Sequence, residues 1–265
     1  MTNSKHAQQG ATLIVVLVLL LLIIIVSTIA IRQGLLSLNI ATSAQAQQLM
    51  NQNSDSAIFH AEDADALKVR MAGNGMFGYI RTAQNKGKEL VFCYKGTNSK
   101  YFNLSQASVI KWEDSKKQPT NNELGSEGYC SLSNSNDYTS GRSAVMTQIS
   151  VRFIDSSEGS NEAFVGSIEG TDTETAKTIA PEKAMITAIS LMPTLSTASN
   201  TQINACLSTH MSNPATAIPS GVTADADSAT GTSFSTSISE CLNALNVPYT
   251  TYITVYNLTQ SVTGS

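Results

Sequence analysis

The sequence has little charge of either sign and no cluster of basic residues. Its 265 residues include 16 Lys or Arg and 20 Asp or Glu, for a net charge of -4, and no Lys or Arg occurs between positions 184 and 265. Proteins that bind nucleic acid neutralise phosphates with grouped basic side chains. The composition therefore argues against nucleic acid as a partner.

The catalytic and cofactor motifs that can be recognised in a sequence are also missing. There is no Gly-x-Ser-x-Gly elbow, no His-Glu-x-x-His helix and no glycine-rich phosphate loop. Only three His are present and no Cys-x-x-Cys spacing occurs, which argues against zinc. The polar residues around His60 fit a solvated helix face, since only His60 and Asp63 would share one side; the others are Glu62 and Asp65. We expect no enzyme, no cofactor and no metal site.

One long hydrophobic run is present near the start of the chain. The segment Ala11–Ile31 reads ATLIVVLVLLLLIIIVSTIAI, without charge, Gly or Pro. At about 1.5 Å per residue, a helix of this length crosses a hydrocarbon core about 30 Å thick. The run is too long for the apolar core of an ordinary secretory signal, and a soluble core helix is rarely apolar on every side. We predict a membrane-inserted helix over residues 11–31.

The helical pattern continues beyond this run. Residues 35–69 are rich in Ala, Gln, Leu and Met, which favour helices, and apolar residues recur close to helical spacing. Glycines at positions 73 and 75 supply a stop. We therefore predict one helix over residues 11–72, transmembrane over 11–31 and amphipathic beyond.

Residues 77–265 predict a β-rich head, because short runs there alternate apolar and polar residues. One further helix is expected at Thr201–Met211, and loops at 118–141 and 221–239. The candidate strands are Phe77–Thr82, Glu89–Tyr94, Ser108–Trp112, Val145–Ile154, Ala163–Ile168, Ala184–Met192 and Tyr249–Leu258. The expected fold class is α+β, with the N-terminal helix packed against an antiparallel sheet.

The loop at 221–239 contains a weak calcium-site pattern. Asp225-Ala226-Asp227 resembles the start of a calcium loop, but Ala229 stands where a further ligand is needed. We interpret the segment as an exposed, low-complexity loop without a metal.

Four cysteines occur, at Cys93, Cys130, Cys206 and Cys241. They allow three pairings, of which sequence proximity favours Cys93–Cys130 with Cys206–Cys241. Each bond would stabilise the head by about 3 to 4 kcal/mol in the chain-entropy model. Paired cysteines behind a membrane segment fit an oxidising, extracytoplasmic compartment.

The residues before the hydrophobic run, Gln9-Gly10-Ala11-Thr12-Leu13, resemble the junction of a type IV prepilin. In that family a membrane peptidase cuts after the Gly and methylates the new amine. The resemblance implies a leader over residues 1–10, cut between Gly10 and Ala11. The family usually has Glu at the fifth mature position, where its carboxylate is thought to meet the terminal amine of a neighbouring subunit. Here that position is Val15, which suggests a subunit that starts the fibre.

The stretch Asn53–Ala64 is similar to the helix that follows the membrane segment in minor pilins of the PilX type, which also tend to lack that Glu. The resemblance implies a pilin-like fold and a structural role in starting a type IV pilus, at or near its tip, with a possible part in adhesion. It implies these partners: other minor and major pilins, the prepilin peptidase, the inner-membrane assembly platform and a large tip adhesin. The expected location is the inner membrane, with a single span and a periplasmic head, and then the extracellular pilus.

Two other functions remain open from the sequence. The related tip pseudopilins of type II secretion share the N-terminal pattern, although they usually carry a larger helical insertion and sometimes calcium ligands. From a different class, the chain fits a single-pass, membrane-anchored extracytoplasmic binding domain, in which Gly10 before the apolar run would be a coincidence.

Overall fold

The computed structural model describes residues 8–63, 66–85, 87–96, 101–139, 142–154 and 182–258. The predicted strand Ala163–Ile168 lies outside these residues. The chain forms two compact units, Met1–Gln48 and Leu49–Ser265, and each is described by itself.

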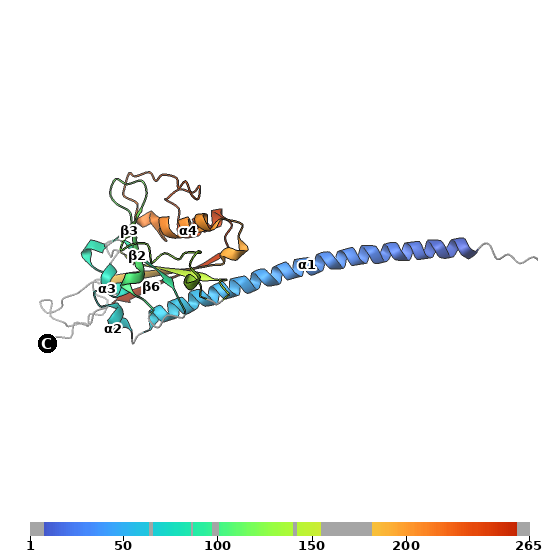
Figure 1. The fold of residues 1–265 in the computed structure, drawn as a ribbon, viewed down its shortest axis with the longest axis horizontal. Helices are drawn as coiled ribbons and strands as arrows, with labels where there is room; N and C mark the ends of the chain where they lie inside the picture. Colours follow the sequence, from blue (N-terminus) through green and yellow to red (C-terminus); the bar gives the residue numbers. More distant parts are fainter. Residues whose placement is uncertain are drawn as a thin grey trace, which may run out of the picture. The chain divides into compact units, whose positions relative to one another are not determined.

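The first unit consists of helix α1 (Gln8–Glu62), which also supplies the first residues of the second unit (Figure 1). Every side chain from position 12 to 45 is exposed, although most of them are apolar up to Ile31. The hydroxyls of Thr28 and Thr42 donate to carbonyl oxygens of the preceding turn, at 2.8 and 3.0 Å. Such bonds satisfy these two hydroxyls within the helix itself. The prediction of a long apolar N-terminal helix is confirmed.

The predicted helix end at residue 72 is wrong, because α1 ends at Glu62. The chain then forms a short helix, α2 (Leu67–Arg70), whose last side chain folds back over the end of α1. The guanidinium of Arg70 donates to the carbonyl oxygens of His60, Ala61 (2.5 Å) and Asp63 (3.1 Å). The last carbonyls of a helix have no partner within the helix, so the Arg70 contact stabilises the end of α1. The amino-acid composition of this region does not indicate that end.

Residues 77–82 were expected to form a strand, but helix α3 (Met76–Ile80) occupies most of that range. Its buried residues share one side of the helix: Met76, Phe77 and Ile80. Gly78 allows close packing, since a Cβ there would lie 1.9 Å from the carbonyl oxygen of Ala72. The segment is too short for its apolar spacing to separate helix from strand.

The second unit contains a six-stranded antiparallel sheet in the order β3-β2-β1-β4-β5-β6. The strands are β1 (Glu89–Tyr94), β2 (Ala107–Lys111), β3 (Thr120–Glu123), β4 (Met146–Ile154), β5 (Glu182–Leu191) and β6 (Tyr249–Leu258). Five of them coincide with predicted strands within two residues. The sixth, β3, lies in a predicted loop because its sequence TNNE has no apolar residue to indicate a strand. The α+β layout is confirmed.

Helices cover both faces of this sheet (Figure 1). On one face, Ala57, Ile58 and Ala61 of α1 pack together with helix α3. They contact alternate residues of the four strands β2, β1, β4 and β5. On the other face lie α4 (Asn200–Thr209) and α5 (Ile238–Ala244). Both begin with a capping box, at Ser199 and Ser237, which satisfies the free N–H groups of the first turn. Short 3-10 helices lie at Ala83–Asn85, Leu104–Gln106, Ser135–Asp137, Pro193–Leu195 and Pro214–Thr216.

The expectation of an exposed loop over 221–239 is wrong in part. Asp227 and Phe234 are buried, at 5 % and 8 % exposure, and Ile238 begins α5. Phe234 packs with Trp112, the only Trp of the chain, in a small cluster beneath this segment. Despite its low-complexity composition, the segment is therefore held against the head at Asp227, Phe234 and Ile238.

Candidate functional site

The predicted processing site lies in the described part of α1. Gly10 and Ala11 belong to its first turns, and the helix continues through them without a break. The side chain of Val15 is exposed, at 59 %, and the first turn of α1 contains no acidic residue. The position that carries Glu in typical pilins thus presents an apolar side chain to the surroundings of the helix.

The apolar surface of α1 is the largest exposed apolar surface in the described chain. Its large apolar residues from Leu13 to Ile31 are each between 46 % and 68 % exposed. A soluble protein rarely leaves such a continuous apolar surface in water. Among the described residues, α1 is the one helix that is long and apolar enough to cross a membrane. By length and composition, this helix meets the requirements of a single membrane span.

The four cysteines form two disulfides in the head. Cys93 is bonded to Cys130 and Cys206 to Cys241, which is the pairing favoured by sequence proximity. All four belong to the apolar cluster between the sheet and the helices α4 and α5. One bond therefore ties the end of β1 to the loop between β3 and β4, and the other ties α4 directly to α5.

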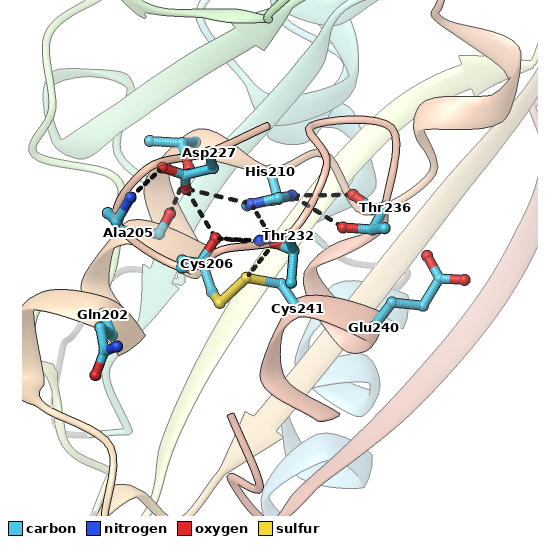
Figure 2. The surroundings of a disulfide bond; sticks show 12 residues. Gln202, Ala205, Cys206, His210, Asp227, Thr232, Thr236, Glu240 and Cys241 are labelled. Atoms are coloured by element: carbon cyan, nitrogen blue, oxygen red, sulfur yellow. Dashed lines mark hydrogen bonds and ion pairs between the residues drawn. A yellow bond between two sulfur atoms is a disulfide. The ribbon is translucent and has the colours of Figure 1, made fainter. Parts of the chain in front are cut away.

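A buried polar cluster centred on His210 lies beside the second disulfide (Figure 2). The Nδ1 of His210 is 3.1 Å from the backbone oxygen of Thr236, and its Nε2 is 3.4 Å from Asp227 Oδ2. The hydroxyl of Thr232 lies 3.4 Å from the same Nε2. The imidazole is 0 % exposed, so no substrate reaches it. The arrangement fastens α4 to the 221–239 segment and does not form a catalytic triad.

The buried carboxylate of Asp227 accepts hydrogen bonds from several residues of the 221–239 segment and from the end of α4. Its Oδ1 accepts from the backbone N–H of Ala229 at 2.9 Å, and its Oδ2 accepts from the hydroxyls of Thr209 (3.2 Å) and Thr230 (3.1 Å). These donors, together with His210, surround the carboxylate that the calcium-like pattern contains. Within the described ranges, no three His, Cys, Asp or Glu side chains are grouped so that they could hold a metal ion.

A cleft of about 520 Å³ lies at the end of α1, a volume in the range of small-molecule sites. Three aromatic rings line it, those of Tyr94, Tyr101 and Phe102, together with polar and ionisable side chains that include His60, Arg70 and Lys95. The Arg70 guanidinium lies 5.3 Å from the centre of the Tyr101 ring, and Lys95 Nζ is 3.0 Å from Asp137 Oδ1. Burial raises the pKa of Tyr101, whose hydroxyl has no hydrogen-bond partner. The cleft therefore combines ring surfaces with ionisable side chains, among them Asp63.

The predicted polar face around His60 is only partly free. His60 and Glu62 are exposed, as expected, but the hydroxyl of Tyr256 donates to Glu62 Oε1 at 2.5 Å. Burial, followed by this hydrogen bond, raises the pKa of Tyr256 to about 12. Asp65 lies outside the described residues.

A buried carboxylate at Glu89, the first residue of β1, could not be predicted from the sequence. Its side chain is 0 % exposed and accepts from Ser212 N (2.8 Å), Ser212 Oγ (2.9 Å) and Asn213 N (3.1 Å). Arg152 donates to the backbone oxygen of Asn213 at 3.1 Å. Burial raises the pKa of Glu89, although these hydrogen bonds and Arg152 oppose the shift. Glu89 thus fastens the loop after α4 to the sheet.

We expect this carboxyl to make stability depend on pH. A group whose pKa is higher in the folded state stabilises the fold below its ordinary value of 4.5 and loses that contribution as the pH rises through the folded-state pKa. Glu89→Gln should therefore flatten the fall in unfolding free energy between pH 4.5 and the folded-state pKa of Glu89. It should also remove about 1 to 3 kcal/mol at all pH values through a lost acceptor. Denaturant unfolding across a pH series checks this, with the exposed Glu127→Gln as control. An unchanged slope in Glu89→Gln would show that this group does not titrate on unfolding.

Comparison with known proteins identifies no relative: no family model, no curated protein and no solved structure matches the chain.

Proposed function

We propose that this chain is a minor pilin, which helps to start a type IV pilus and lies at or near its tip. In this account the prepilin peptidase cuts between Gly10 and Ala11, and α1 is held in the inner membrane with the head in the periplasm. The assembly platform then transfers the chain into the fibre, where α1 packs against the helices of other minor and major pilins. A large tip adhesin is a further partner.

The observation that carries the proposal is the combination at the start of the chain. Gly10 lies in the first turns of α1, directly before a run that is apolar on every side, and the chain continues into a disulfide-braced head. A helix that must leave lipid and enter a fibre needs an apolar surface in both places, because helices in lipid associate through van der Waals packing. Val15 supports the tip position, because a first subunit has no earlier neighbour whose amine would need a Glu partner.

The test is where the protein lies in purified filaments. We expect the unmodified chain at one end of each filament, detected by immunogold labelling of the head. Val15→Glu should spread labelling along the shaft, because it restores the carboxylate at the fifth mature position. Val16→Glu is the matched control: it inserts the same charge, at a similar cost of up to about 3 kcal/mol, one residue away. Labelling of the unmodified chain along the whole shaft, or its absence from filaments, would contradict the proposal.

One observation favours a second candidate function, a membrane-anchored binding domain. The aromatic cleft at the end of α1 has the volume of a ligand site. A chain of this class would stay in the membrane with residues 1–10 still attached. The same filament preparation distinguishes the two, because an anchored binding domain would be absent from it.

A further inference from the structure

The cleft at the end of α1 is formed by parts of the head that hold one another in place. Its wall comes from the end of α1, from residues in and beside α2, and from residues 94–96 and 101–104. The Arg70 guanidinium donates to three carbonyl oxygens at the end of α1, and the hydroxyls of Tyr94 and Ser56 are 3.2 Å apart. These contacts fix the wall without a ligand, and a largely preformed cleft is typical of small-molecule sites.

Aromatic rings form a connected surface in this cleft. The rings of His60, Tyr94 and Tyr101 contact one another, with centroid distances of 6.0 Å for His60–Tyr94, 6.2 Å for His60–Tyr101 and 5.9 Å for Tyr94–Tyr101. Phe102 is half-buried and also lines the cleft. Grouped rings of this kind offer a large apolar contact area. They favour a ligand that has an apolar face of ring size.

The charges of the cleft compensate one another. Arg70 interacts electrostatically with Asp63, and Lys95 Nζ is 3.0 Å from Asp137 Oδ1. Each of these cations therefore already has an anion nearby. A strongly charged ligand, such as a phosphate or a metal ion, would have to disturb these pairs, and separating a buried pair leaves a charge uncompensated. The cleft therefore favours a ligand without net charge.

Polar groups that can bond a ligand also lie along the wall. His60 and Asn74 are exposed, and the amide of an Asn both donates and accepts hydrogen bonds. The Tyr101 hydroxyl is buried and has no hydrogen-bond partner among the described residues. Buried polar groups in native proteins almost always have a partner, which is an ordered water or another bound molecule where the chain supplies none. The ligand should therefore carry groups that both donate and accept.

We propose that this cleft binds a neutral oligosaccharide. A pyranose ring has an apolar C–H face, which packs on aromatic rings, and hydroxyl groups, which both donate and accept hydrogen bonds. It matches the ring surface, the compensated charges and the polar groups of the wall together. The volume of about 520 Å³ suits an oligosaccharide better than a single ion. This site goes beyond a role in a pilus, and it gives the second candidate function, a binding domain, a class of ligand.

The test uses the full chain in micelles of lauryldimethylamine oxide, a detergent without a sugar headgroup. The labelled chain is applied to a glycan array that carries the same core oligosaccharides in neutral, sialylated and sulfated forms. We expect saturable binding to a subset of the neutral glycans and weaker binding to their acidic forms, because Arg70 and Lys95 are already paired. Saturation-transfer NMR with a bound glycan in solution should then show the strongest transfer at the C–H protons of one sugar face.

Matched variants place the binding in this cleft. His60→Ala removes an exposed ring from the wall and Asn74→Ala an exposed amide. Each should weaken binding about fivefold, the effect of one lost hydrogen bond. Phe59→Ala is the control, because Phe59 is 71 % exposed on the same helix and is not among the described residues of the wall. It should bind like the unmodified chain. Unchanged thermal unfolding of each variant checks that the head keeps its fold.

Three results would overturn the inference. The first is the lack of saturable binding to any neutral glycan of the array. The second is a preference for sialylated or sulfated forms, which would show that the cleft recognises charge. The third is equal binding by His60→Ala, Asn74→Ala and the unmodified chain, which would place the sugar elsewhere. Binding is measured on the purified chain, so its outcome is independent of cleavage after Gly10 and of the position of the chain in filaments.

Discussion

Removing the Cys206–Cys241 disulfide is expected to lower the free energy of unfolding of the head by about 3 to 4 kcal/mol. The two residues are 35 positions apart, and the bond removes much of the freedom of that loop in the unfolded chain. Both cysteines are 0 % exposed. The substitutions should be to Ala, because Ser would bury a hydroxyl in an apolar cluster. A loss of this size is a large share of the total unfolding free energy of a domain, which is typically about 5 to 15 kcal/mol.

The second disulfide supplies the matched control for this experiment. Cys93 and Cys130 are 37 positions apart, so the chain-entropy contribution should be almost equal. A larger loss for the Cys206 and Cys241 pair would measure the additional packing between α4 and α5. Denaturant unfolding of the full chain, followed by the fluorescence of Trp112, gives both values. A loss below about 1 kcal/mol for either pair would contradict the role assigned to the disulfides in bracing the head.

The parts of the fold that could be predicted are those in which one physical signal dominates. Uninterrupted apolar character identified the first part of α1, and period-two alternation identified strands such as β4 and β6. These patterns reflect an element that is apolar on all sides or on one side, which the order of the residues records directly. Cysteine spacing likewise favoured the pairing that the structure contains.

The parts that could not be predicted depend on contacts between distant residues. Helix α1 ends at Glu62 because Arg70 reaches back to its carbonyls, and no local breaker marks that position. Strand β3 has no apolar residue, and its position depends on its pairing with β2. Helix α5 did have a signal, the capping-box spacing of Ser237 and Glu240, within a stretch whose composition indicated a loop.

The candidate site shows the same division. Gly10, Ala11 and Val15 could be selected because their meaning depends on their positions before and within one helix. The contact of His210 with Asp227 could not, because it joins the end of α4 to a later loop. The cleft at the end of α1 could not either, because three separate parts of the chain line it.

The N-terminus of the mature protein tests the central claim most directly. The measurement is the intact mass and terminal sequence of the chain from cells with and without the prepilin peptidase. The account predicts a chain that begins at N-methylated Ala11 when the peptidase is present, and one that keeps residues 1–10 when it is absent. Gly10→Val should give the uncut form in both strains, because the resemblance places the cut after this Gly. A chain that retains residues 1–10 in the presence of the peptidase, or the same cut product in both strains, would contradict the account.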